Sequence, residues 1–68
     1  MTSKVQRQTL IVRLVGDHEV TSQPDLIDLL AAEGIDATQA TVSRDLDDIG
    51  AVKVRVPRGN TVYAIPEF

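Results

Sequence analysis

Apolar residues recur at helical spacing in the first part of the chain. Five of them fall on one face at a helical period and predict a helix over residues 3–15: Val5, Leu10, Ile11, Leu14 and Val15. Gly16 is the expected stop of this helix. Val12 lies off the apolar stripe, so we expect the helix to be covered on more than one side.

A second helix is predicted between Ser22 and Gly34. Ser22 can cap its N-terminus, Pro24 is tolerated in the first turn, and Asp25 stands at the capping-box position. The apolar stripe of this segment consists of Leu26, Ile27, Leu29, Leu30 and Ala31. Gly34 is the expected stop, because glycine commonly follows the last helical residue.

A third helix follows a brief connection at residues 35–37. Thr38 is a good N-cap and Gly50 a good stop. The inward face is predicted from the spacing i, i+4 and i+7 and consists of Val42, Leu46 and Ile49. Two helices joined by a short turn that begins with glycine predict a helix-turn-helix.

The period of the pattern changes after Gly50. Residues 52–56 alternate between valine and cations, residues 57–60 are rich in turn formers, and residues 61–65 are again β-branched and aromatic, which predicts a hairpin. Residues 19–21 favour one further short strand. The order of elements predicts an α+β fold: a winged helix-turn-helix of three helices with a C-terminal β-hairpin wing, with room for a short third strand.

Length and composition indicate one domain over residues 1–68 and exclude several kinds of chemistry. Cysteine is absent and His18 is the only histidine, which argues against disulfides, thiolate metal sites and a catalytic cysteine–histidine pair. No phosphate-binding loop or nucleophile–base set is present, so we expect neither an enzyme nor a bound cofactor. No apolar run approaches the roughly 20 residues of a membrane span, and we expect a cytoplasmic protein without a membrane partner.

The charge is unevenly distributed. The formal net charge of −3 argues against nucleic acid as a partner, because affinity for phosphates comes largely from cations. Residues 16–34 contain no lysine or arginine. The cations are Lys4, Arg7, Arg13, Arg44, Lys53, Arg55 and Arg58. If folding gathers these segments on one face, a basic surface exists despite the acidic total.

The outward face of the third helix carries groups that can read base edges. Arginine can bond guanine through two hydrogen bonds, glutamine can bond adenine, and a small alanine permits close approach. Recognition helices contact bases mainly through their N-terminal residues, which here are Gln39, Ala40, Thr41, Ser43 and Arg44. The alternative is an ordinary solvated helix face, and Asp47 and Asp48 support it, because carboxylates are repelled by phosphate.

The hairpin and the first helix supply the remaining cations. Arg58 in the turn can enter a narrow minor groove, whereas hairpin edges also carry Lys and Arg to discourage edge-to-edge pairing. For Lys4 and Arg7 we expect a solvated face, with phosphate contact as the alternative.

Residues 38–46, read with residues 50–54, closely resemble the recognition helix and first wing strand of bacterial arginine repressors. The similarity extends from about Arg7 to Pro66 and is most specific over residues 38–46. It implies a DNA-binding domain of a transcriptional repressor, whose helix over residues 39–49 binds A·T-rich, imperfectly palindromic operators of arginine metabolism, including arginine biosynthesis. Ser43 and Arg44 then stand at operator-contacting positions, Gln39 and Thr41 at neighbouring ones, and Arg58 at the wing tip.

The resemblance also implies what this domain lacks. Family members bind the co-repressor L-arginine and form hexamers through a C-terminal domain, which we expect to be absent here. The isolated domain is then a monomer with double-stranded operator DNA as its partner, and a full-length parent is a homohexamer. A winged-helix module that binds protein instead of DNA is the alternative, and the acidic pair Asp47 and Asp48 favours it.

We therefore predict that L-arginine does not stabilise this chain. A ligand that does not bind the native state leaves the thermal midpoint unchanged. Thermal unfolding followed by circular dichroism, with L-arginine and with D-arginine as the matched control, measures this. A reproducible rise of the midpoint with the L-enantiomer alone would contradict the expectation.

Overall fold

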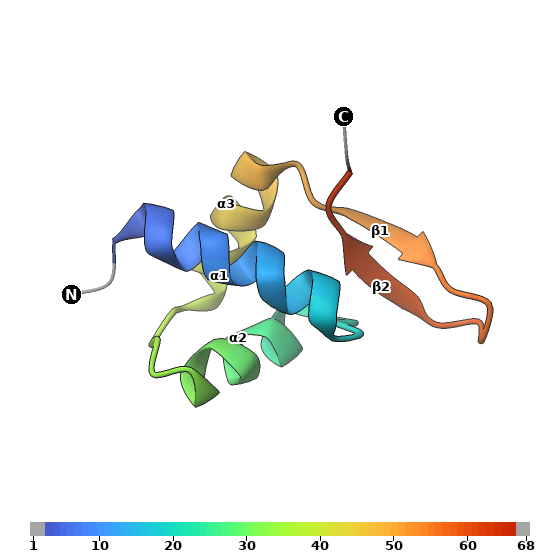
Figure 1. Ribbon diagram of the computed structural model, residues 1–68, viewed down its shortest axis with the longest axis horizontal. Coiled ribbons are helices and arrows are strands. Elements are labelled where there is room, and N and C mark those ends of the chain that lie inside the picture. Colours follow the sequence, from blue (N-terminus) through green and yellow to red (C-terminus); the bar gives the residue numbers. More distant parts are fainter. Residues whose placement is uncertain (1–2, 67–68) are drawn as a thin grey trace.

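The computed structural model describes residues 3–66, in which three helices precede a two-stranded antiparallel hairpin. The elements are α1 (Lys4–Asp17), α2 (Gln23–Ala32), α3 (Gln39–Ile49), β1 (Val52–Arg55) and β2 (Thr61–Ala64). In Figure 1 the hairpin extends sideways from the group of helices. This arrangement confirms the predicted α+β winged helix-turn-helix. No helix within residues 3–66 is long and apolar enough to cross a membrane.

The ends of α1 differ from those expected. Ser3 and Gln6 form a capping box, in which each side chain accepts a hydrogen bond from the backbone N–H of the other residue. The prediction that Gly16 stops the helix is wrong, because α1 continues to Asp17. Gly16 lacks the positive φ of a helix-terminating glycine, and the His18 N–H still donates to the Leu14 carbonyl at 2.9 Å.

The ends of α2 and α3 follow the sequence signals, except that the carboxylate of Asp25 does not complete the expected capping box. The hydroxyl of Ser22 accepts from the Asp25 N–H at 3.3 Å, whereas the Asp25 carboxylate accepts from the Thr21 hydroxyl at 2.5 Å. Gly50, with φ of 78°, ends α3 in the left-handed region, which costs glycine little because it has no Cβ. The start of α2 and the end of α3 are thus both fixed by local contacts and backbone conformation.

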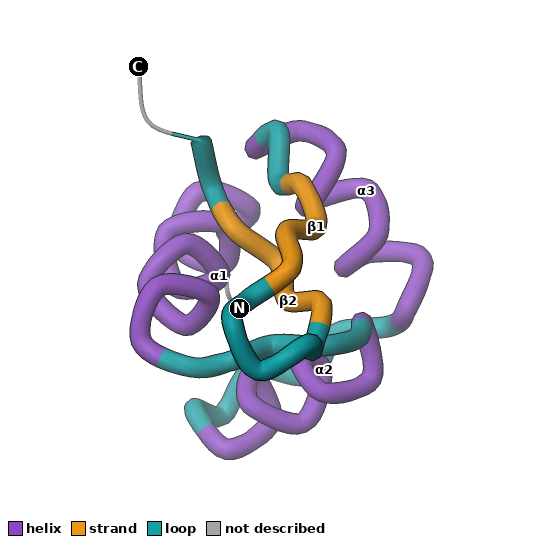
Figure 2. The backbone as a smooth tube through the Cα atoms, turned by 90° about the vertical axis from the view of Figure 1, so that its right-hand side faces the viewer, coloured by secondary structure: helices purple, strands orange, loops and turns teal. Residues whose placement is uncertain are grey.

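The core lies where the three helices and β2 meet. Its buried residues come from all three helices and from the segment after α1: Ile11, Leu14, Val15, Val20, Leu26, Leu30, Val42 and Leu46. Figure 2, which looks along the hairpin, shows the helices grouped around this centre with β2 nearer than β1 to α1. The partly buried Tyr63 and Ile65 pack against the same core. The hairpin is therefore attached through β2.

The first strand of the hairpin is exposed along its whole length. Val54 pairs with Val62 and Arg55 with Thr61, yet only Val62 is buried. Val52 and Val54 remain 45% and 41% exposed, and the strand stops one residue before Val56. Alternation of valine and cations therefore did not produce a buried face, because β1 is an edge strand and no helix covers it.

The prediction of a short strand at residues 19–21 is wrong, because the structure, which describes these residues, has no strand there. Val20 accepts one hydrogen bond from the Tyr63 N–H at 2.9 Å, on the edge of β2 that β1 leaves free. The N–H of Val20 is directed to the His18 carbonyl at 3.2 Å. Because the N–H of Val20 is used in this tight turn, it cannot donate to β2. The contact between this segment and β2 therefore consists of one hydrogen bond and does not extend into a strand.

Truncation of a valine on the inner face of α3 tests the position of the core. Val42 is 0% exposed and Val5 is 74% exposed, and both lie in helices, so the expected place of Val5 on the covered face of α1 is wrong. Val42→Ala removes about two buried methylene equivalents and leaves a cavity, so we expect a loss of about 2 kcal/mol. Val5→Ala is the matched control and should change stability by less than about 0.5 kcal/mol. Urea unfolding measures both, and equal losses would contradict the assignment.

Candidate nucleic-acid interface

The N-terminal half of α3 presents most of the residues predicted to read bases. Gln39, Ala40 and Arg44 are exposed, whereas Thr41 and Ser43 are half-buried. The exposed set combines an amide, a methyl group and a guanidinium, which can donate and accept hydrogen bonds at a base edge. Contact of these residues with DNA stays a prediction, and the half-buried position of Ser43 differs from the outward one expected.

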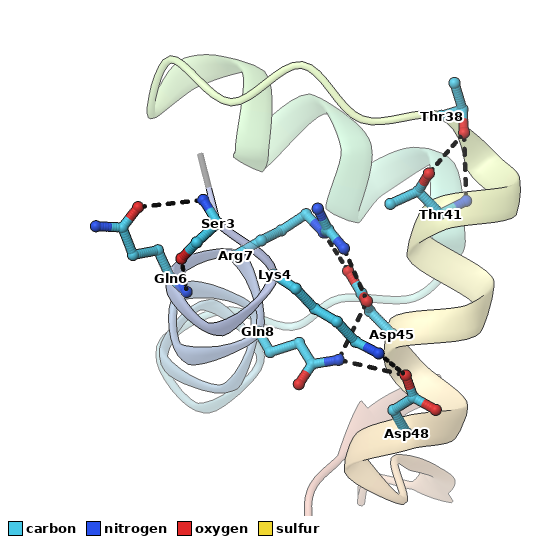
Figure 3. A network of polar contacts seen from close by, with 9 residues as sticks. All are labelled: Ser3, Lys4, Gln6, Arg7, Gln8, Thr38, Thr41, Asp45 and Asp48. Atoms are coloured by element: carbon cyan, nitrogen blue, oxygen red, sulfur yellow. Dashed lines mark hydrogen bonds and ion pairs between the residues drawn. The ribbon is translucent and has the colours of Figure 1, made fainter. Parts of the chain in front are cut away.

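The first turn of α3 is fixed by two threonines. The Thr38 hydroxyl accepts from the Thr41 N–H at 3.2 Å, and the two hydroxyl oxygens lie 3.0 Å apart. Figure 3 shows both contacts at the start of the helix. Since the Thr41 hydroxyl is already paired with Thr38, its first role is to rigidify the end of the helix that carries Gln39 and Ala40.

A buried carboxylate joins α3 to α1. Asp45 is only 1% exposed, and Arg7 donates to it through both Nε and Nη2, the second bond measuring 3.1 Å. Gln8 adds a third hydrogen bond, from Nε2 to Oδ1 at 3.2 Å. Figure 3 shows these donors converging on Asp45 from α1. This two-pronged geometry is the strongest form of arginine–carboxylate contact and fixes how α3 sits on α1.

The same contact shifts two acid–base equilibria. The hydrogen bond from Arg7 holds the pKa of Asp45 below its ordinary value, against the opposing effect of burial and with help from Gln8. The hydrogen bond to Asp45 raises the pKa of Arg7. A carboxyl group with a depressed pKa stabilises the fold above its unfolded pKa, and this contribution is lost as the pH falls through the folded pKa.

Sequence reasoning missed Asp45, although a signal was present. The inward face was assigned from Val42, Leu46 and Ile49, and position 45, one turn after Val42 and one turn before Ile49, lies at the edge of that face. An acidic residue on a buried stripe requires a cation, and Arg7 supplies it from α1. The expectation of a solvated face for Arg7 is therefore wrong.

A second ion pair lies at the rim of the same contact. The Nζ of Lys4 is 2.9 Å from Oδ2 of Asp48, and Gln8 reaches that carboxylate at 3.5 Å. Both charged partners remain substantially exposed. Asp48 thus neutralises a cation of its own chain, which gives one member of the acidic pair a structural role, while Asp47 is exposed.

The cation at the tip of the wing is also paired. Arg58 forms an ion pair with Glu19, from the connection between α1 and α2, and both side chains are exposed. Lys53 of β1 lies over the ring of its cross-strand partner Tyr63, with 5.0 Å between Nζ and the ring centroid. The tip of the wing is therefore tied to the body through an exposed ion pair, whereas the contact of Lys53 with Tyr63 lies within the hairpin.

The arrangement is suited to binding through hydrogen bonds and charge. Lys4, Arg7 and Arg44 surround one hollow together with Ala40 and Thr41. Within residues 3–66, no three His, Asp or Glu side chains cluster in a way that could hold a metal ion. Three of the seven cations, from α1 and α3, thus lie together, so the sequence-based condition that the cations gather is met only in part.

Comparison with known proteins gives one consistent result. Residues 2–68 match the family described as "Arginine repressor, DNA binding domain". The chain is 44% identical over 66 residues to an arginine repressor of Anaeromyxobacter sp. (strain Fw109-5). The match covers 97% of this chain and 42% of that relative. The chain thus spans less than half the length of the curated relative it matches.

Removal of the buried charge tests the contact between α1 and α3. Asp45→Asn leaves the Arg7 guanidinium without its carboxylate, so we expect a loss of about 3 kcal/mol at neutral pH. Thermal unfolding between pH 7 and pH 2.5 should also show a weaker acid-induced loss of stability in the variant than in the parent. Asp47→Asn, an exposed change in the same helix, is the control. Parallel acid profiles for parent and Asp45→Asn would contradict the assignment.

Proposed function

Because the chain belongs to the arginine repressor DNA-binding domain family, we propose that α3 enters the major groove of an A·T-rich, imperfectly palindromic operator. The family is a DNA-binding domain of a repressor and not an enzyme. The observation that carries the proposal is the exposed N-terminal half of α3, with Gln39, Ala40 and Arg44 on a helix that Asp45 fixes to α1. A rigid helix places its side chains at base edges with little loss of freedom on binding.

The proposed contacts follow from the chemistry of each side chain. Arg44 donates two hydrogen bonds to guanine, Gln39 pairs with adenine, and the methyl of Ala40 meets a thymine methyl. Thr41 and Ser43 are half-buried, and we assign them shorter contacts to bases or phosphates near the helix start. In this proposal the exposed residues of α3 contact the bases, and contacts to phosphates fix the position of the helix in the groove.

The wing supplies a second contact in this proposal. Arg58 lies exposed in the turn between β1 and β2, where it can reach an A·T-rich minor groove. It would exchange Glu19 for the DNA, and an exposed ion pair contributes at most about 1 kcal/mol. The pairing of Arg58 in the free protein therefore does not oppose its proposed role.

The activity of a full-length repressor extends the proposal beyond this chain. The relative is named an arginine repressor and is more than twice as long as the matched part. We propose that this domain acts in the cytoplasm as one arm of a homohexamer that controls genes of arginine metabolism, with L-arginine bound elsewhere. Alone and monomeric it would bind weakly, whereas linked copies can gain roughly 10² to 10⁴ in affinity.

A protein-binding module is the second candidate, and one observation favours it. Asp47 is exposed on the same helix as Arg44, and the chain carries a net charge of −3. This alternative predicts that loss of charge at Arg44 and Arg58 leaves partner binding intact.

Fluorescence anisotropy with an operator duplex and a scrambled duplex tests the DNA-binding proposal. We expect Arg44→Ala to weaken operator binding by about 1–3 kcal/mol and to reduce the preference for operator over scrambled DNA. Arg13→Ala, on α1 and paired with Glu33, is the control and should change neither quantity. Equal losses of affinity for both duplexes would show that Arg44 contacts a phosphate and not a base. Absence of binding to either duplex at low salt would overturn the proposal for this chain.

A further inference from the structure

We propose that the hollow between α1 and α3 holds a backbone phosphate of the DNA, with Lys4 and Arg7 of α1 as its cationic ligands beside Arg44 of α3. This inference rests on the proposed function and adds α1 to the binding surface. It names a contact that carries no base information but sets how α3 enters the groove.

The hollow has the size and lining that such a contact needs. Its volume is about 370 Å³ and its walls come from two helices: Lys4, Arg7, Ala40, Thr41, Arg44 and Asp45. Three of these six residues are cations, and the carboxylate among them is buried and bonded to Arg7 and Gln8. The small side chains of Ala40 and Thr41 leave the hollow open beside the helix start.

Arg7 is oriented for this role before any ligand arrives. Its Nε and Nη2 donate to Asp45, whereas within residues 3–66 its Nη1 makes no hydrogen bond to protein. A guanidinium carries five N–H donors in a planar fork, so a fork held on one edge presents the other edge in a fixed direction. Asp45 is thus a positioning residue for Arg7, as well as the link between the helices.

Lys4 supplies a mobile charge at the rim. Its side chain is 59% exposed and pairs with Asp48, which is 41% exposed. An exposed pair of this kind adds little stability, because water screens it and both side chains lose freedom. Lys4 can therefore leave Asp48 for a phosphate at small cost.

The position of the hollow indicates what a phosphate bound there would do. It lies beside Ala40 and Arg44, two of the residues proposed to meet base edges. A phosphate held there would join the DNA backbone to α1 and α3 at once. The insertion angle and register of α3 would follow from that anchor, which is the usual function of phosphate contacts.

A salt titration of matched variants tests the inference. Lys4 and Arg13 both lie on α1, are 59% and 60% exposed, and pair with an exposed carboxylate. We expect Lys4→Gln to weaken binding to operator and scrambled duplexes by equal factors. The slope of log affinity against log salt should fall by about one, as for one lost phosphate contact. Arg13→Gln should leave affinity and slope unchanged, and Lys4→Arg should retain the parental slope.

The outcomes separate this inference from the proposed function. Operator preference in the parent chain reports on base reading by α3, independently of Lys4. If the parent prefers its operator but Lys4→Gln keeps the parental slope, the phosphate contact is wrong and the proposed function stands. A drop of the slope in Arg13→Gln equal to that in Lys4→Gln would show a general charge effect and would also overturn the inference. Absence of duplex binding by the parent would overturn both proposals.

Discussion

The contact of Asp45 with Arg7 is the constraint on which the rest of the structure depends. A carboxylate in the interior is tolerated only where a cation and further donors satisfy it, and here Arg7 and Gln8 of α1 meet that requirement. The apolar core would permit α3 to rotate or slide by small amounts, because apolar contacts are not directional. Directional bonds from two donors remove that freedom, so the exposed face of α3 is set by what lies behind it.

An acidic chain can still gather cations at one place. Lys4, Arg7 and Arg44 line the hollow, where the buried Asp45 offsets Arg7 and the exposed Asp48 pairs with Lys4. The acidic stretch of residues 16–34 lies mainly in α2 and its flanks, away from the hollow beside α3. Net charge is therefore a poor guide to the potential at one face, because fields fall off within about 10 Å at ordinary salt.

Much of the fold could be predicted because its signals are local. Ser22, Thr38 and Gly50 mark helix ends through interactions within a few residues, and the periods of 3.6 and 2 distinguish the helices from the hairpin. Exposure of β1 could not be predicted, since alternation does not reveal whether another element covers a strand. The burial of Asp45 could not be predicted for a related reason, because its partner Arg7 lies 38 residues away in sequence. The exposed positions of Gln39, Ala40 and Arg44 could be predicted from the helical period, whereas the placement of Lys4 and Arg7 beside them required the packed structure.

The ion pair between Arg58 and Glu19 has a kinetic consequence. Exposed side chains change rotamer within picoseconds to nanoseconds, far faster than a protein diffuses away from an encountered surface. Release of Arg58 from Glu19 therefore adds no slow step to an encounter. The backbone hydrogen bond from Tyr63 to Val20, together with the packing of Tyr63 and Ile65 on the core, meanwhile keeps the base of the hairpin on the body. The wing thus has one end fixed to the body and a turn whose ion pair exchanges rapidly. Diffusion, and not internal rearrangement, would limit the rate at which Arg58 meets a partner.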